Sequence, residues 1–231
     1  MFSVIFEVFP KAERLEEYLA LAKSLRPVLT KIDGFVDNER FESNRRPGWI
    51  LSHSTWRDEK SLVRWRTTCE HHMIQVRGRS EVLQDYRIRV GVVMADTGAP
   101  TPAATLQQSF EETEVGAAKL ATLTEITPQP GISVDVNELA SVLDLDLAHD
   151  GVLGSDFFSS IYIPGKVALL LSWRDAQAAK VWLPATASAT HLLRHRKVGI
   201  VRDYGMFDRR ESPQFFPDAK GRVTKHSRPV P

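Results

Sequence analysis

Apolar residues in the first part of the chain alternate between strand-like and helix-like patterns. Residues 1–9 are apolar on both alternations, which is typical of a strand covered on both faces, and Pro10 ends this run. Residues 11–29 carry apolar side chains at steps of three and four, which predicts an amphipathic helix. Residues 35–42 and 49–56 predict the two strands of a hairpin, because a turn rich in Asn, Pro and Gly separates them.

A second helix is predicted to follow this hairpin. Asp58 is a residue type that caps helix N-termini. The apolar stripe of the predicted helix is Leu62, Trp65, Cys69 and His72 or Met73. Residues 86–94 predict a final strand. The resulting order βαββαβ is the ferredoxin-like arrangement, in which two helices cover one face of a four-stranded antiparallel sheet.

The same signals recur later in the chain. The tripeptide Trp-Arg-Asp stands at 56–58 and again at 173–175, and each is followed at the same spacing by a tryptophan, Trp65 and Trp182. The Asp-Tyr pair at 85–86, where the predicted final strand of the first copy begins, recurs at 203–204. Shared spacing of this kind predicts an internal repeat.

We therefore predict an α+β chain of two tandem ferredoxin-like domains. The first domain spans residues 1–95 and the second, more diverged domain spans 116–211, with a linker at 96–115 and an extended C-terminal tail at 212–231. The helices leave one face of each sheet open, and the other copy is the natural cover for it.

Charge and cysteine content narrow the possible partners. The chain has 30 Lys and Arg against 29 Asp and Glu, so its net charge of +1 provides no field that would attract nucleic acid or anionic lipid. Cys69 is the one cysteine and cannot form an internal disulfide. The start of the chain does not have a signal-peptide pattern, and no apolar run approaches the ~20 residues of a membrane helix. These features predict a cytoplasmic protein without nucleic-acid or membrane partners.

Three local motifs resemble the antibiotic biosynthesis monooxygenase family. They are the Ile-Asp-Gly-Phe turn at 32–35, the strand ending in Ser-Thr-Trp-Arg-Asp at 54–58, and the helix carrying Trp65 and the His-His pair at 71–72. The resemblance is stronger over residues 1–94 than in the second half. It implies a dimeric α+β barrel with sheet packed against sheet, formed within this tandem chain or in a homodimer.

The resemblance also implies an activity. Members of the family include oxygenases of polyketide phenols, quinol monooxygenases and haem-degrading enzymes. The implied function here is a monooxygenase that acts with O₂ on an aromatic or polycyclic phenol or quinol. It would need no cofactor or would use external reduced flavin.

The haem-degrading branch of the family provides the first alternative. That branch uses an Asn on the first strand, a helix Trp and a His ten residues later, where this chain has Glu7, Trp65 and Gln75. A haem-binding, haem-degrading monooxygenase with His72 or His71 on the iron is therefore an alternative. A non-catalytic ligand-binding barrel is the second alternative.

Candidate catalytic residues follow from the predicted faces. Trp65 lies on the stripe facing the sheet and would hold the plane of a flat substrate. His72 is seven positions further, about 20° away around a helix, so we expect it to face the pocket as a general base and His71 to point away. Glu7 could be a second base or could pair structurally with Arg87 or Arg89.

Other polar and aromatic residues could complete the pocket. Tyr86 is expected to bond a developing oxyanion, with His53 as the other candidate for that role. The residues expected to contact substrate are His53, His71, Gln75, Trp182 and His191.

The second copy and the missing motifs add two expectations. Pro184 should bend or stop the helix after Trp182. The basic residues 194–196 favour a solvated helix face, with binding of an acidic group as the alternative. The sequence contains no Gly-rich phosphate loop and no cysteine pair for zinc, so no metal site is predicted.

Overall fold

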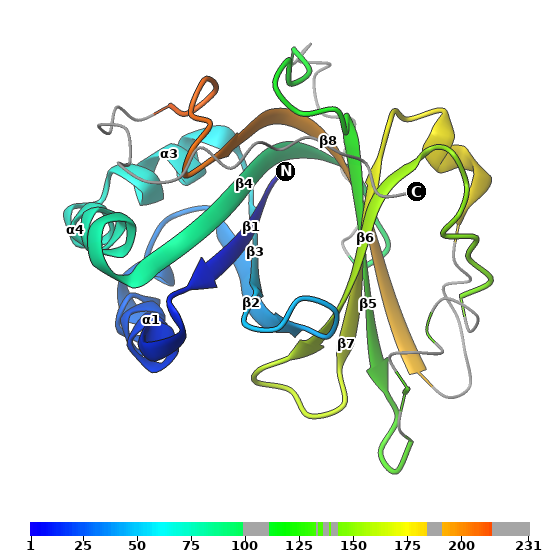
Figure 1. The fold of residues 1–231 in the computed structure, drawn as a ribbon, viewed down its shortest axis with the longest axis horizontal. Coiled ribbons are helices and arrows are strands. Elements are labelled where there is room, and N and C mark those ends of the chain that lie inside the picture. Colours follow the sequence, from blue (N-terminus) through cyan, green and yellow to red (C-terminus); the bar gives the residue numbers. More distant parts are fainter. Residues whose placement is uncertain (99–110, 133, 136–138, 140–142, 184–190, 214–231) are drawn as a thin grey trace.

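The computed structural model describes residues 1–98, 111–132, 134, 135, 139, 143–183 and 191–213 (Figure 1). Its strands are β1 (Phe2–Pro10), β2 (Phe35–Ser43), β3 (Ile50–Trp56), β4 (Leu83–Asp96), β5 (Leu120–Pro128), β6 (Val152–Ser160), β7 (Val167–Trp173) and β8 (His191–Gly205). Its helices are α1 (Leu15–Ser24), α2 (Arg26–Leu29), α3 (Glu59–Thr67) and α4 (Cys69–Arg77). Shorter turns are the 3₁₀ helices η1 (Ala12–Arg14) and η4 (Ala178–Val181) and the π-helical turn η2 (Gly78–Val82).

These eight strands form one closed barrel in the order β1-β3-β2-β6-β7-β5-β8-β4. Each half of the chain contributes four neighbouring strands in an equivalent order, β4-β1-β3-β2 and β8-β5-β7-β6. The halves meet at two antiparallel seams, β4 with β8 and β2 with β6. The α+β class is confirmed and the barrel closes within one chain, while the division into two domains, 1–95 and 116–211, stays a prediction.

The predicted linker and tail lie mostly outside the described residues, at 99–110 and 214–231. Near both segments, the Glu211 carboxylate accepts hydrogen bonds from the backbone amides of Glu114 and Val115, at 2.6 and 3.1 Å. This carboxylate ties the start of the second half to the residues that follow β8.

Helices α1 to α4 all belong to the first half and lie outside the barrel, against β1, β3 and β4 (Figure 1). The pleat of β1 separates the two environments. Val4 and Phe6 point toward the helices, whereas Ile5 and Glu7 point into the barrel. No helix among the described residues is both long enough and apolar enough to span a membrane.

The barrel interior is filled by an apolar cluster and by paired charges. The cluster joins both halves and contains Ile5, Phe41, Leu51, Ala118, Ala121, Leu123, Phe158, Ala168, Leu170 and Ile200. Arg89 and Arg196, each about 1% exposed, pair with Glu7 and Glu125 respectively. Arg46 also pairs with Glu7, and Lys166 with Glu125, so these buried charges form small networks that are costly to disrupt.

The predicted continuous helix after Asp58 is interrupted at Thr68. Thr68 has an extended backbone (φ −61°, ψ 133°), so α3 ends before it and α4 begins after it. The hydroxyls of Thr67 and Thr68 donate to the carbonyls of Val63 and Arg64, four residues earlier. Two adjacent β-branched residues with such bonds weaken a helix, which is a physical reason for the break.

Two expectations for the second half also need correction. The 3₁₀ helix η4 ends at Val181, and Trp182 has an extended backbone (φ −134°, ψ 126°), so this Trp does not lie within a helix as Trp65 does. The basic residues 194–196 lie on β8 and not on a solvated helix face. His195 and Arg196 are buried there, because β8 is paired on both sides, with β4 and with β5.

The β4–β8 seam gives a stability prediction. A Cβ added at Gly91 would lie 2.4 Å from the carbonyl oxygen of Gly199 and 2.5 Å from a methyl carbon of Val198. Gly91→Ala should therefore force the seam apart and lower the free energy of unfolding by about 1–3 kcal/mol in urea titrations. Gly154→Ala is the matched control, since its added Cβ would be 3.9 Å from the nearest side chain. Equal stability of the two variants would contradict this account of the seam.

Candidate active site

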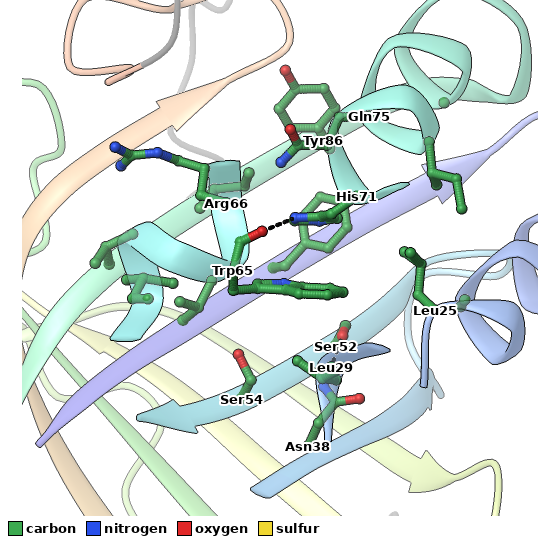
Figure 2. Close-up of a pocket in the computed structure, with 18 of the residues that line it drawn as sticks. Leu25, Leu29, Asn38, Ser52, Ser54, Trp65, Arg66, His71, Gln75 and Tyr86 are labelled. Carbon is green, nitrogen blue, oxygen red and sulfur yellow. Dashed lines mark hydrogen bonds between the residues drawn. The ribbon is translucent and has the colours of Figure 1, made fainter. Parts of the chain in front are cut away.

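A pocket of about 230 Å³ lies between the helices and the outer face of the first-half sheet (Figure 2). Val4, Phe6, Ile88 and Val90 form its floor on β1 and β4. The apolar part of its helical wall consists of Tyr18, Leu21, Ala22, Leu25, Leu29, Leu62, Val63, Trp65 and Ile74. Apolar walls of this kind are typical of small-molecule sites.

Trp65 and His71 form a stacked pair inside the pocket. Their ring centroids are 4.1 Å apart with an interplanar angle of 14°. The His71 Nδ1 atom is 3.1 Å from the backbone carbonyl oxygen of Trp65, as Figure 2 shows. The break at Thr68 makes this possible, because it turns the chain so that His71 folds back over Trp65.

These contacts determine the protonation of His71. A carbonyl oxygen can only accept a hydrogen bond, so Nδ1 must carry the proton. Burial lowers the pKa of His71 to about 4, so the ring is neutral at pH 7. The Nε2 atom of the neutral ring therefore keeps its lone pair, which makes it a hydrogen-bond acceptor and a possible proton acceptor.

The expected positions of the two histidines were reversed. His72 is exposed and does not line the pocket, whereas His71 does. The seven-residue spacing from Trp65 assumed one continuous helix, and the extended Thr68 between α3 and α4 removes that periodicity. The expected position of Trp65 facing the sheet is confirmed.

Tyr86 and Gln75 also line the pocket as expected, with Ile88 and Val90 on the same face of β4 as Tyr86. The Tyr86 hydroxyl oxygen accepts hydrogen bonds from Arg79 at 2.9 Å and from Arg209 at 2.6 Å.

Glu7 and His53 were expected in the pocket but lie on the opposite face of the sheet, inside the barrel. The Glu7 carboxylate pairs with Arg89 at 2.5 Å and with Arg46 at 2.6 Å. Burial alone would raise the pKa of Glu7, but the charges of Arg89 and Arg46 hold that pKa below its usual value. The structural alternative for Glu7, pairing with Arg89, is thereby confirmed.

His53 also has a partner in the interior. One of its ring nitrogens, Nε2, is 2.8 Å from the Ser3 hydroxyl. Burial lowers the pKa of His53 to about 4. His53 shares its side of β3 with Leu51 and Thr55, and that side faces the barrel and not the substrate pocket.

The two candidates in the second half do not line the pocket either. The indole nitrogen of Trp182 donates to the Leu143 carbonyl at 3.0 Å, and Trp182 packs in a buried cluster with Leu139 and Leu143. His191 is the half-buried first residue of β8. Among the described residues, Trp182 is thus part of the buried core of the second half.

Several polar lining residues were missed in the sequence. They include five arginines, Arg40, Arg66, Arg79, Arg202 and Arg209, and the strand residues Asn38, Ser52 and Ser54. The strand residues on β2 leave little signal, because residues 37–40 are all polar and do not alternate. Arg202 and Arg209 leave none, since they come from the second half.

Comparison with known proteins agrees with this architecture. Residues 1–77 match the antibiotic biosynthesis monooxygenase family. Across 95% of the chain, the sequence is 43% identical to the whole of a protein from Pyricularia oryzae named jasmonate monooxygenase ABM. The chain therefore belongs to the antibiotic biosynthesis monooxygenase family, and its activity is that of a monooxygenase. This membership sets aside the non-catalytic barrel.

Solved structures show the same fold in distant proteins. An aldoxime dehydratase is similar over 87% of this chain and 83% of its own, with a TM-score of 0.52 and 12% identity. A second aldoxime dehydratase, crystallised with butyraldoxime, covers 86% of this chain and 79% of its own, with a TM-score of 0.52 and 13% identity. At these identities the likeness concerns the fold alone.

Monooxygenases of this family are typically cofactor-free. The haem alternative can be compared with the pocket itself. The ring of His71, the histidine that lines the pocket, is held flat against Trp65. The first-strand position at Glu7 faces away from the pocket, toward Arg89. Glu7 and Gln75 therefore do not provide the Asn and the His that the haem-degrading branch uses.

The buried His71 gives a prediction about acid stability. The unfolded chain binds a proton at His71 near pH 6.5, whereas the folded chain does so only near pH 4. Lowering the pH from 6.5 to 4 should therefore destabilise the fold, by up to about 3 kcal/mol from this residue. Urea titrations at several pH values should show a smaller loss for His71→Gln than for the unmodified chain. Parallel pH profiles for the two proteins would show that His71 is not held neutral by burial.

Proposed function

We propose that the pocket between helices and sheet is the active site of an oxygenase for a small, largely apolar ring compound. Jasmonate, named in the Pyricularia oryzae relative, is the first substrate to test. It is a carboxylic acid with a five-membered ketone ring and an unsaturated chain. An aromatic phenol or quinol is the second candidate, which the flat wall formed by Trp65 favours.

The main support for this proposal is that the similarity to the Pyricularia oryzae relative extends over both halves of the chain. Residues from both halves line the pocket, including Arg202 and Tyr204 on β8. The 43% identity covers 95% of the chain, so the relationship is not limited to the first half, where the family match lies. A shared substrate class is a reasonable inference from a relationship that includes both parts of the site.

The electron balance separates the two substrate classes. Monooxygenation places one oxygen atom of O₂ on the substrate and reduces the other to water, which consumes two electrons. A phenol or quinol can supply these electrons itself after losing its proton to a base, for which we propose the Nε2 atom of His71. An unactivated C–H bond of jasmonate has no such acidic proton, so its oxidation needs an external reductant such as reduced flavin.

Trp65 is the residue we propose to hold the substrate ring. Its indole lies in the middle of the pocket, stacked on His71 and 6.5 Å between centroids from Trp56 (Figure 2). An aromatic wall of this kind orients a ring without hydrogen bonds. The residue's role is positional, and proton removal is assigned to His71.

Oxygen consumption tests the proposal directly. The purified chain should consume O₂ with jasmonic acid in the presence of reduced flavin, or with a polycyclic hydroquinone without it. Mass spectrometry should find one added oxygen atom in the product. Trp65→Ala should lower kcat/KM about tenfold, equivalent to about 1.4 kcal/mol of transition-state stabilisation.

The control for this test is Trp49→Ala. Trp49 stacks on Phe9 with centroids 5.3 Å apart and does not line the pocket, so its loss removes the same side chain elsewhere. Equal loss of activity in both variants, or no oxygenated product from either substrate, would contradict the proposed function.

A further inference from the structure

Two guanidinium groups from opposite halves of the chain meet on one phenol oxygen at the edge of the pocket. Arg79 lies in the π-helical turn η2 after α4, and Arg209 follows β8. Both donate to the Tyr86 hydroxyl, at 2.9 and 2.6 Å, so their donor nitrogens are no farther apart than the sum of these distances. All three side chains line the pocket, and Tyr86 is buried. We call Arg79, Tyr86 and Arg209 the anion cluster.

The anion cluster is rich in hydrogen-bond donors. Arg79 also donates to the Met206 carbonyl at 3.2 Å, and Arg209 also donates to the Ser212 hydroxyl. A guanidinium group has five N–H donors and no acceptor. The Tyr86 oxygen therefore accepts from both arginines, and its own hydroxyl proton is the group it can give. A carboxylate accepts from hydroxyl and guanidinium donors alike, and such charge-assisted bonds are stronger than neutral ones.

The charge of the pocket favours the same ligand. Among the described residues that line it there are five arginines and one acid, Glu59, which pairs with Arg202 at 3.2 Å. Arg79 and Arg209 place two positive charges beside the Tyr86 hydroxyl. An anion is favoured at such a place, because opposite charges attract strongly in a partly desolvated site.

We propose that the anion cluster binds the carboxylate of the substrate. This inference rests on the proposed function of the pocket. It adds that the substrates carry a carboxylate. Figure 2 shows Tyr86 and Gln75 on one side of the Trp65–His71 stack and Asn38 and Ser54 on the other. A carboxylate held at Tyr86 directs the apolar part of the substrate toward Trp65.

This assignment gives Tyr86 a different role from the one expected from the sequence. There it was a candidate to bond an oxyanion that develops during the reaction. With two arginines already on its oxygen, it instead belongs to a permanent positive site that acts on the bound substrate. Arg79 and Arg209 are then binding residues of the known class of reaction.

Jasmonic acid and its methyl ester test the proposal, because they share one apolar body and differ in charge. Binding is followed by tryptophan fluorescence, and KM and kcat by oxygen uptake. The unmodified chain should bind the acid about tenfold or more tightly than the ester. Arg79→Gln and Arg209→Gln should each weaken acid binding by a similar factor and leave the ester unchanged. Arg209→Lys, which keeps the charge but not the planar fork, should fall between.

Arg64→Gln is the matched control for a lost positive charge. Arg64 is exposed on α3, pairs with Asp33 at 3.3 Å and does not line the pocket, so its variant should retain the preference for the acid. Circular dichroism and thermal unfolding check that each variant folds. Arg79 and Arg209 come from different halves of the chain. If one of the two glutamine variants does not fold, the other still tests the proposal. A cluster variant that binds acid as tightly as the unmodified chain, or loses acid and ester equally, would overturn the proposal.

A second ligand pair separates failure of the anion cluster from failure of the proposed substrate. Anilinonaphthalene sulfonate and phenylnaphthylamine are apolar dyes of nearly the same shape, and only the first is charged. If neither form of jasmonate binds, selective loss of the charged dye in Arg79→Gln and Arg209→Gln would support the anion cluster and reject jasmonate. Unchanged binding of both dyes in both variants would overturn the anion cluster itself.

Discussion

The ion pairs inside the barrel determine where this protein can hold a ligand. Arg89 with Glu7 and Arg196 with Glu125 fill the space between the two half-sheets together with the apolar cluster. Other pairs cross between the halves, as Arg46 does to Asp156 at 2.6 Å. Such pairs are costly to break once buried. With the interior occupied in this way, the pocket lies on the other face of the first-half sheet, beneath its helices.

The sequence was sufficient for most of the first half but not for the orientation of its histidines. Apolar runs and turn residues located the strands, and the repeated Trp-Arg-Asp tripeptides located equivalent turns at 56–58 and 173–175. The face of Trp65 also followed from periodicity. The break at Thr68 did not, because neighbouring threonines reduce helix stability only slightly and their effect depends on tertiary packing. That one residue reversed the positions assigned to His71 and His72.

The other missed features depend on contacts between distant parts of the chain. A strand covered on both faces has no solvent side, so alternation alone could not decide whether Glu7 faced the helices or the barrel. Arg202 and Arg209 belong to the second half in sequence but to the first-half pocket in space. In the second half, Trp182 packs with Leu139 and Leu143. The shared spacing of Trp65 and Trp182 therefore did not give the two residues the same surroundings in the described structure.

The pairing of β8 has a consequence for how such a chain can diverge. This strand bonds to β5 along its first part and to β4 along its last part, so it belongs to both half-sheets at once. Without the second half, β4 and β2 would be exposed edges that seek another strand. Substitutions in β8 therefore act on both half-sheets, and also on the first-half pocket, which Arg202 and Tyr204 of β8 line. The second half is constrained by the strand that it supplies, whatever else in it changes.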